Sequence, residues 1–204
     1  MSAFELMNRL ENKEIGVAIS GGVDSVALVK YLLKKQFNVT LFFFDHKNDY
    51  SQTEFEWVLK FTCENNLKLI VGNNTEPAEI GVSKEDYWRR CRYKFLNSQE
   101  MTIATAHTLD DVVEWWLFTC CHGEGHIMPY QTGNIIRPFL LTRKDKIIKY
   151  CLDRDIRWLE DKSNEDFEFA ARNRIRHKII PEILKINPGI HKVLKKKLMA
   201  KWRI

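Results

Sequence analysis

The 204-residue chain is long enough for one good-sized hydrophobic core, and its 45% hydrophobic and 29% charged residues exclude global disorder. No apolar run approaches the roughly 18 residues of a membrane helix, and residues 1–14 lack an apolar signal-peptide core, so we expect a cytoplasmic protein. The formal net charge of +5 is uneven, because residues 172–204 carry +10 whereas residues 1–171 carry −5, which favours a polyanionic partner for the C-terminal part.

Apolar blocks alternate with helical patterns along the chain. The expected strands cover residues 15–19, 39–44, 67–71, 102–105 and 135–137. The expected helices cover residues 24–35, 52–65, 84–98, 108–121 and 143–154. This alternation predicts an α/β fold, namely a Rossmann-like parallel sheet of about five strands with helices on both faces. Ligands of such a sheet bind at the carboxyl ends of its strands.

A break at residues 187–189 (Asn-Pro-Gly) separates this pattern from a basic helix. We therefore expect a main domain over residues 1–186 and a short basic helix over residues 187–204. For its lysine run, a solvated helix face is the alternative to a polyanion-binding surface. The five cysteines are odd in number and contain no C-x-x-C pair, so we expect reduced, mostly buried thiols.

The stretch SGGVDS at residues 20–25 lies between the first strand and the first helix. Gly21 and Gly22 let the backbone turn tightly and approach an anion, and Asp24 and Ser25 begin a helix whose free N–H groups point towards it. The Walker pattern G-x-x-x-x-G-K-[ST] and the pattern G-x-G-x-x-G are both absent. The loop is typical of a phosphate site, with an ordinary capped strand–helix turn as the alternative.

A second constellation occupies residues 103–114, IATAHTLDDVVE, where a strand runs into His107 and an acidic helix follows. The spacing of three puts Asp111 and Glu114 on one helical face, while Asp110 complements the helix dipole. Two carboxylates on that face can hold Mg²⁺ or an ammonium group. The alternative is an acidic cap on a solvated helix.

The full stretch SGGVDS resembles the PP-loop of the ATP pyrophosphatases, and over most of residues 14–185 the chain resembles the tRNA(Ile)-lysidine synthetases. The matching stretches, in order, are SGGVDS, FDHKNDYSQTEFE, RRCRY (89–93), AHTLDDVVE, HGEGH (122–126), RPFL (137–140), WLEDKSNED (158–166) and RNRIRHKIIP (172–181). The resemblance implies a PP-loop domain over residues 1–186. It also implies a short form, because longer members of that family carry additional C-terminal domains.

That family uses ATP and Mg²⁺ to adenylate the ring carbonyl oxygen of the wobble cytidine in isoleucine tRNA with a CAU anticodon. The ε-amine of free L-lysine then displaces AMP. By resemblance, ATP would contact Ser20, Gly21, Gly22, Asp24, Ser25, Asp45 and His46, with Asp24 also placing Mg²⁺. The catalytic residues would be Asp24, His107, Asp111, Glu114 and Arg172. The substrates would contact Arg89, Asp111, Glu114, Arg172 and Arg176.

Within that set, Asp111 and Glu114 would receive the ammonium groups of lysine and Arg89 its carboxylate. His107 would lie near the phosphates or the adenylated base, and the two late arginines near the RNA or the developing charge of the adenylyl transfer. The chain departs from the family at Thr108, Val112, Trp115 and His122, where the family usually has histidine, glutamine, threonine and arginine. By resemblance, these departures would alter the pocket without abolishing it.

Several alternatives stay open from the sequence. His107 could be a buried structural histidine, Asp161 and Asn164 could be a capped loop, and the arginines at 89, 90 and 92 could form an exposed face. We expect Trp115 and Trp116 in the core rather than in a base-stacking platform. The alternative functions are another PP-loop enzyme, either a tRNA thiolase or a ligase for a different amine, and a non-catalytic RNA-binding relative.

Overall fold

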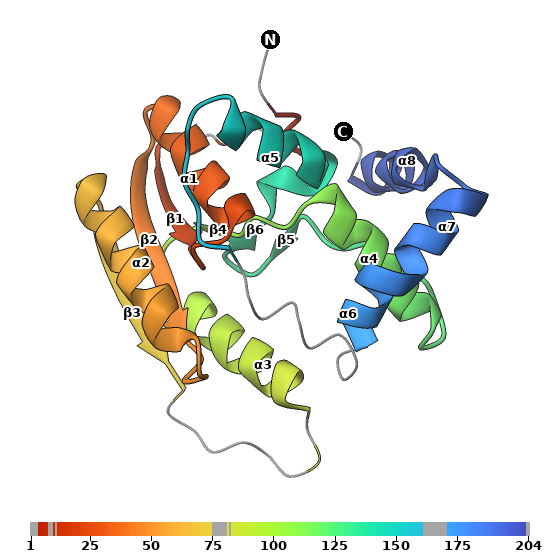
Figure 1. Ribbon diagram of the computed structural model, residues 1–204, viewed down its shortest axis with the longest axis horizontal. Coiled ribbons are helices and arrows are strands. Elements are labelled where there is room, and N and C mark those ends of the chain that lie inside the picture. Colours follow the sequence, from red (N-terminus) through yellow and green to blue (C-terminus); the bar gives the residue numbers. More distant parts are fainter. Residues whose placement is uncertain are drawn as a thin grey trace.

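Figure 1 shows the computed structural model of the chain, which describes residues 4–7, 10, 12–74, 81, 83–160 and 171–202. The strands are β1 (Glu14–Ala18), β2 (Asn38–Asp45), β3 (Lys68–Asn73), β4 (Ile103–Ala104), β5 (Gln131–Thr132) and β6 (Ile135–Ile136). The first helices are α1 (Val23–Lys34), α2 (Ser51–Glu64), α3 (Lys84–Asn97), α4 (Leu109–Cys120), the 3₁₀ turn η1 (Pro138–Leu141) and α5 (Lys144–Leu152). The C-terminal helices are α6 (Ala171–Arg174), the π-helical turn η3 (Ile175–Ile179), α7 (Ile180–Ile186) and α8 (Ile190–Trp202).

The strands form one sheet in the order β3-β2-β1-β4-β6-β5. Every pairing is parallel except the edge pair of β5 and β6, which is antiparallel. The predicted α/β class is confirmed, with six strands in place of about five. The edge hairpin was not expected, since two-residue strands are too short to show an alternating pattern; Gly133 turns it with a φ of 61°.

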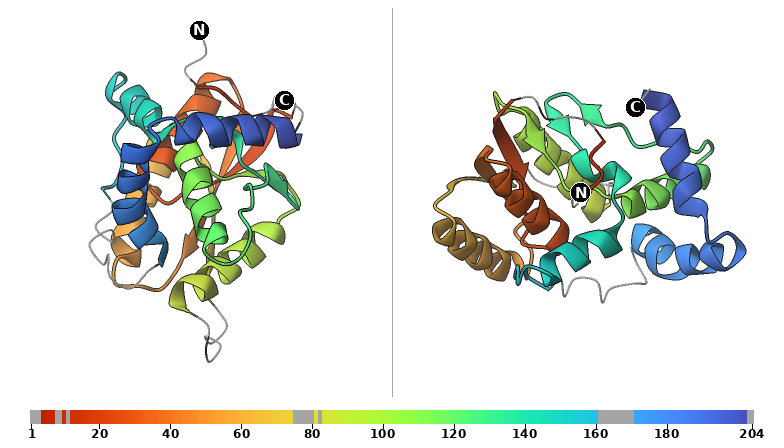
Figure 2. Two further views of the ribbon diagram at one scale, coloured as in Figure 1. Left: turned by 90° about the vertical axis from the view of Figure 1, so that its right-hand side faces the viewer. Right: turned by 90° about the horizontal axis from the view of Figure 1, so that it is seen from above.

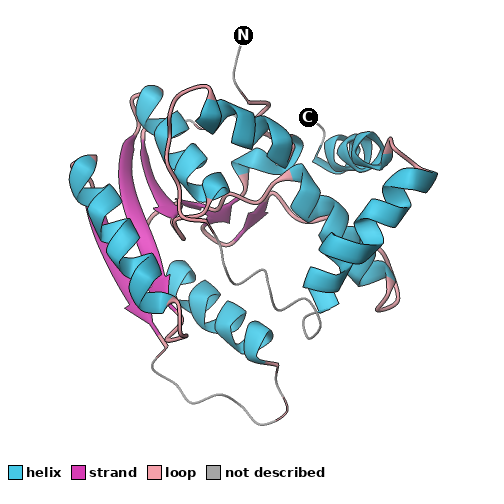
Figure 3. Ribbon diagram, viewed as in Figure 1, coloured by secondary structure: helices cyan, strands magenta, loops and turns pink. Residues whose placement is uncertain are grey.

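Helices cover both faces of the sheet, as the alternation of its buried residues requires (Figure 3). Val17, Leu41 and Ala104 point into the larger core with residues of α1, α2, α4 and α5. Phe42 and Ile103, their neighbours along the strands, point to the opposite face and pack with residues of α3 in a smaller core. The predicted arrangement of helices on both faces is therefore confirmed.

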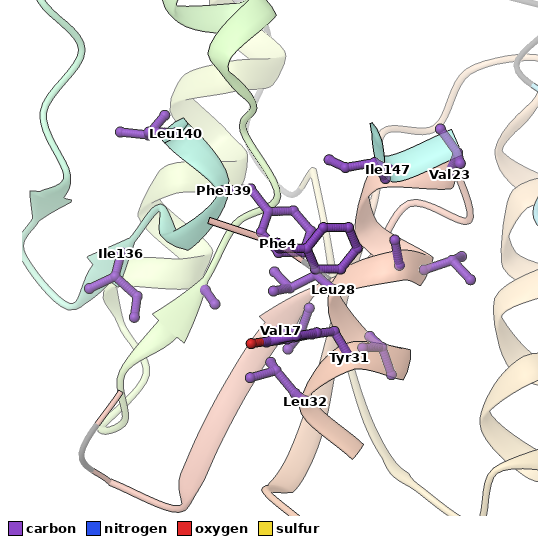
Figure 4. Close-up of a cluster of buried hydrophobic side chains, with 14 of the residues drawn as sticks. Phe4, Val17, Val23, Leu28, Tyr31, Leu32, Ile136, Phe139, Leu140 and Ile147 are labelled. Atoms are coloured by element: carbon purple, nitrogen blue, oxygen red, sulfur yellow. The ribbon is translucent and has the colours of Figure 1, made fainter. Parts of the chain in front are cut away.

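The larger core reaches under the helix that follows the SGGVDS stretch (Figure 4). The ring of Phe4 lies 5.1 Å from that of Tyr31 in α1, 4.7 Å from Phe139 in η1 and 4.5 Å from Tyr150 in α5. All four side chains are buried. These contacts tie the N-terminal segment, α1, η1 and α5 into one rigid support, because tilted ring pairs at such distances add to the burial of apolar area.

The C-terminal helices pack unequally on the rest of the molecule. In the segment from α6 through η3 to α7, Ile175 is the only residue that the structure describes as buried. By contrast, α8 buries Leu194 and Leu198 in the larger core and crosses the end of α4 (left view of Figure 2). The predicted basic C-terminal helix is confirmed as a helix, with one face joined to the main core.

Two further expectations concern the thiols and the membrane. Cys151 is buried, Cys91 is half-buried, and the other three cysteines are exposed, so the prediction of mostly buried thiols is wrong. All five are free thiols. Among the described helices, none combines the length and the apolar character that crossing a lipid bilayer requires.

Candidate functional site

Three neighbouring strands deliver the candidate residues to one edge of the sheet. The chain leaves β1 into the stretch from Ser20 to Ser25, leaves β2 through Asp45 into His46, and leaves β4 through Thr105 into His107. Since β1 pairs in parallel with both β2 and β4, these three strand ends lie at the same edge. The SGGVDS stretch and the segment that follows β4 therefore begin at the same edge of the sheet.

The SGGVDS loop has the geometry of an anion site. Gly21 has a φ of 85°, and a Cβ on it would lie 3.2 Å from the Trp57 ring and 3.3 Å from Cβ of Leu159. Ser25 Oγ donates to the carbonyl oxygen of Gly22 at 2.9 Å. Gly22 is the N-cap of α1 and supplies no side-chain cap, so the first N–H groups of α1 remain available to a ligand.

Asp24 stands in the first turn of α1 with a cation beside it. Lys144 Nζ at the start of α5 lies 3.2 Å from Asp24 Oδ2. Asp24 Oδ1 is buried and has no hydrogen-bond partner in the described part of the chain. Burial raises the pKa of the Asp24 carboxyl, while Lys144 opposes that rise. The sequence reasoning missed Lys144, because nothing distinguishes it from the two other basic residues of TRKDK (142–146).

The unpaired Asp24 Oδ1 gives a direct test of whether the loop suits Mg²⁺. A buried carboxylate oxygen without a donor suits a hard cation that prefers oxygen ligands. Among the residues that the structure describes, no three metal-ligating side chains gather in one place. The site therefore fits a Mg²⁺ ion held by one carboxylate together with the phosphate oxygens of a nucleotide, and not an all-protein cage.

The acids of α4 separate into two roles. Asp111 forms a capping box with Thr108, whose hydroxyl accepts from the backbone N–H of Asp111. Asp110 faces the opposite way and accepts from the backbone N–H of Lys144 at 2.8 Å and from the His191 ring at 3.1 Å. Burial acts to raise the pKa of Asp110, but these hydrogen bonds outweigh it and lower the pKa. Asp110 thus links α4, α5 and α8.

Asp111 and Glu114 share one arginine. Arg176 Nη2 lies 2.7 Å from Glu114 Oε2 and 3.2 Å from Asp111 Oδ1, and Arg176 Nε donates to Glu114 Oε2 at 2.8 Å. The side chain of Glu114 is 9% exposed and that of Arg176 is 42% exposed. Burial raises the pKa of Glu114, against the influence of Arg176. The resemblance predicts this arginine near the RNA or near the developing charge of the adenylyl transfer, and in the structure it contacts the acid pair.

Two arginines flank Trp115 on the outer side of α4. The guanidinium carbons of Arg89 and Arg172 lie 5.3 Å and 5.2 Å from the centre of the Trp115 ring. Arg172 also lies 5.0 Å from the ring of Phe118. These are cation–π distances. The expectation of a core position is therefore wrong for Trp115, which is half-buried under arginines, while Trp116 packs against the larger core.

His107 is half-buried and neutral at pH 7. Its Nδ1 lies 2.9 Å from the hydroxyl oxygen of Thr105. Burial lowers the pKa of His107 to about 4, with the nearby Asp111 opposing and Arg137 adding to the effect. Arg137, from the RPFL stretch, is buried and donates to the hydroxyl of Tyr93 at 3.2 Å. Arg137 was not among the expected site residues, although its motif had been noticed.

Of the neighbouring arginines in α3, Arg90 is exposed and pairs with Asp86 at 2.9 Å. Arg92 is half-buried, and its burial lowers the pKa of its guanidinium. An exposed helix face is therefore the right description for Arg90 alone among the three.

Asp45 and His46 lie at the end of β2. The carboxylate of Asp45 contacts Lys47 twice. Lys47 Nζ lies 2.7 Å from Asp45 Oδ2, and the backbone N–H of Lys47 donates to Asp45 Oδ1 at 2.8 Å. The His46 ring lies 5.1 Å from Phe44 and 5.5 Å from Trp88 of α3. Burial, then Arg92, lowers the pKa of His46 to about 4. Flat rings and a carboxylate therefore lie at the edge of the sheet where the SGGVDS loop begins.

Two features lie apart from these residues. Asp161 and Asn164 fall outside the described part of the chain. A cavity of about 400 Å³, lined by residues of α1 and α2 and by residues 154–157, contains none of the candidate site residues. Trp57 lines this cavity and also lies next to Gly21 of the loop.

Comparison with known families and proteins gives consistent matches. A family described as a PP-loop domain matches residues 2–183. A tRNA(Ile)-lysidine synthase of Thermosipho africanus is 33% identical over 211 residues, covering 95% of this chain and 49% of that protein. One of Lactiplantibacillus plantarum is 31% identical over 195 residues, covering 86% and 43%. The chain spans about half the length of the curated relatives it matches.

Solved structures share the fold at low sequence identity. An NH3-dependent NAD synthetase from Campylobacter jejuni has a TM-score of 0.50 and 15% identity, covering 94% of this chain and 86% of that chain. An NMN synthetase from Francisella tularensis has a TM-score of 0.50 and 13% identity, covering 72% and 63%. At these identities the likeness concerns the fold alone.

Proposed function

This chain belongs to the PP-loop family, and from that premise we propose that it joins lysine to the wobble cytidine of isoleucine tRNA at the expense of ATP. The observation that carries the proposal is the closeness of a phosphate loop and an acid pair. β1 and β4 are adjacent parallel strands, so the loop after β1 and the helix α4 after β4 begin at the same edge of the sheet. Asp111 of the acid pair and Arg176, which contacts both acids, influence the pKa of Asp24 in the loop. The names of the relatives, tRNA(Ile)-lysidine synthases, agree with this chemistry.

We assign ATP to the loop. The N–H groups at the start of α1, with the hydroxyls of Ser20 and Ser25, would hold the pyrophosphate end, and Gly21 and Gly22 would allow its close approach. Asp24 would hold Mg²⁺ through its unpaired Oδ1. That ion would supply charge neutralisation to the phosphates. Asp45 and His46, beside the Trp88 ring, would lie along the adenosine.

The first step needs positioning more than proton transfer. The ring carbonyl oxygen of cytidine attacks the α-phosphorus of ATP, and pyrophosphate leaves. Arg172 is suited to stabilise charge that develops on the phosphate oxygens or to contact the RNA. His107 would act as a neutral hydrogen-bonding group near the adenylated base, because its pKa of about 4 keeps it uncharged at neutral pH.

The second step requires an amine that has lost its proton. Asp111 and Glu114 would bind the ammonium groups of lysine and Arg89 its carboxylate. Glu114 is the suited proton acceptor, since burial raises the pKa of its carboxyl. The ε-nitrogen then attacks the ring carbon that bears the adenylated oxygen, and the C–O bond breaks to release AMP.

The C-terminal part supplies the positive surface that RNA requires. In α8 the lysines at 192, 196, 197 and 201 are exposed, while Leu194 and Leu198 face the core. Such a surface would bind phosphates and weaken with rising salt. The division of the chain at residue 187 remains a proposal, as does the identity of the tRNA.

The test follows radiolabelled lysine into isoleucine tRNA bearing a CAU anticodon, with ATP and Mg²⁺ present. We expect Asp24→Asn to abolish pyrophosphate release. We expect Glu114→Gln to retain RNA-dependent pyrophosphate release but to lose labelling by at least about 100-fold, the size of a general-base contribution. The exposed Glu124→Gln serves as control.

Either variant at wild-type activity in both assays would reject the assignment of its residue. RNA-dependent pyrophosphate release without lysine incorporation by the wild-type chain would retain the adenylation step. It would show that the amine or the RNA is a different one.

A further inference from the structure

The acid pair proposed for the amine already holds a cation of the chain itself. Arg176 contacts Glu114 twice, at 2.7 Å and 2.8 Å, and Asp111 once, at 3.2 Å. Asp111 Oδ2 is taken by the backbone N–H and the hydroxyl of Thr108, which leaves Oδ1 for a cation. An ammonium group and the Arg176 guanidinium would therefore compete for the same oxygens.

We propose that Arg176 is a resident counter-ion that keeps the acid pair closed, and that an amine substrate binds only by displacing it. This inference rests on the proposed function for the identity of the amine, but the exchange itself depends only on the three side chains. It makes Arg176 a specificity-determining residue. A ligand without a positive charge cannot take the place of the guanidinium between two carboxylates, one of which is buried.

The two sides of the contact differ in how firmly they are held. Asp111 and Glu114 project from α4, whose Val112 and Val113 are fully buried in the larger core. Arg176 projects from η3. In the described segment from α6 through η3 to α7, only Ile175 is buried. Displacement would therefore move the arginine and leave the acids in place. A π-helical turn at this point agrees with the frequent occurrence of such turns at functional sites.

A phosphate group is the chemistry that would stabilise the displaced arginine. Guanidinium binds phosphate in a bidentate manner, and Arg176 lies close enough to the loop to influence the pKa of Asp24. Both ATP and RNA carry phosphate. Binding of either would open the acid pair, and by linkage the amine would strengthen that binding in return.

The experiment measures lysine binding by calorimetry, without nucleotide or RNA, for the wild-type chain and for Arg176→Gln. We expect the variant to bind lysine at least about tenfold more tightly, because no internal cation has to leave. Arg174→Gln removes the same charge from an exposed position two residues earlier, and it should bind as the wild type does. Equal or weaker binding by Arg176→Gln than by wild type would overturn the exchange.

Two further titrations of the wild-type chain show whether the phosphate of ATP or that of RNA stabilises the displaced arginine. They do not depend on the folding of a variant. Lysine is titrated in the presence of a non-hydrolysable ATP analogue, and separately in the presence of tRNA. We expect tighter lysine binding in at least one arm, and the arm that shows it identifies the source. No tightening in either arm would overturn the coupling to phosphate.

The outcome is separable from that of the proposed function. Tighter lysine binding by Arg176→Gln, with no lysine incorporation by the wild type, would reject the proposed product and retain the exchange. Incorporation by the wild type, with no gain of affinity in the variant, would retain the proposed function and reject the exchange.

Discussion

Thr108 and Asp111 form reciprocal hydrogen bonds at the start of α4. Asp111 Oδ2 accepts from the backbone N–H of Thr108 at 2.7 Å and from its hydroxyl at 2.8 Å. Asp111 Oδ1 consequently faces Arg176. The capping box therefore stabilises the helix and also orients a carboxylate of the candidate site. Thr108 is one of the positions that depart from the pattern given by the resemblance, and here it has a definite structural role.

Thr108→Ala removes the hydroxyl of this cap and leaves Asp111 Oδ2 with the backbone N–H of residue 108 alone. We expect the free energy of unfolding to fall by about 1 kcal/mol, the usual effect of losing an N-cap side chain. We also expect a raised KM for lysine, because Asp111 would lose one of the two hydrogen bonds that orient its carboxylate. Urea denaturation and amine-dependent kinetics measure the two effects. Thr108→Ser keeps the hydroxyl and should restore both, whereas unchanged stability in Thr108→Ala would contradict the role of the cap.

Gly21 and Gly22 are adjacent but should differ in their tolerance of a side chain. Gly21 has a φ of 85° and a Cβ there would press on Trp57 and Leu159, whereas a Cβ on Gly22 would meet only Ser20 Oγ at 3.5 Å. We expect Gly21→Ala to lower the free energy of unfolding by about 1–2 kcal/mol, the cost of a left-handed backbone for a residue with a Cβ. Gly22→Ala is the matched control in the same denaturation experiment. Equal losses in the two variants would contradict the asymmetry.

His107 should make the fold less stable in acid. Burial lowers its folded pKa from 6.5 to about 4, so the unfolded chain binds the proton more readily. Stability present above pH 6.5 is thus lost as the pH falls towards 4. We expect this loss to be about 1–2 kcal/mol by pH 4.5, less than the full shift implies because the side chain is only half-buried.

The test compares wild type with His107→Gln by urea denaturation at pH 7 and pH 4.5. The gap between their free energies of unfolding should narrow at the lower pH. His122→Gln, at an exposed position, provides a second curve for comparison. A gap between wild type and His107→Gln that stays constant with pH would show that His107 does not titrate as its burial implies.

The basic helix α8 should contribute to the stability of the whole domain. Leu194 is fully buried in the larger core, while its neighbour Val193 is 42% exposed. We expect Leu194→Ala to cost about 2–5 kcal/mol, the range for truncation of a buried leucine. We expect little effect from Val193→Ala. Thermal unfolding of both variants decides the matter, and a small loss in Leu194→Ala would mean that α8 docks weakly.

Much of the architecture followed from the sequence because apolar periodicity is local information. The predicted strand at 39–44 and helix at 84–98 match β2 and α3 within about two residues at each end. Parallel strands bring their carboxyl ends to one edge, so the approach of Ser20, Asp45 and His107 to the same edge could be anticipated without coordinates. The edge hairpin could not, because two-residue strands carry no period.

The pairing of charges was decided by the tertiary structure alone. Arg176 is 62 residues from Glu114 and 65 from Asp111 along the chain, and no spacing in the sequence indicates that they meet. The same holds for Lys144 beside Asp24, and for Arg89 and Arg172 on Trp115. Sequence motifs identify which side chains can do the chemistry. Which cation neutralises which acid depends on how α4, α5 and η3 pack, because long charged side chains reach partners that only the packing brings within range.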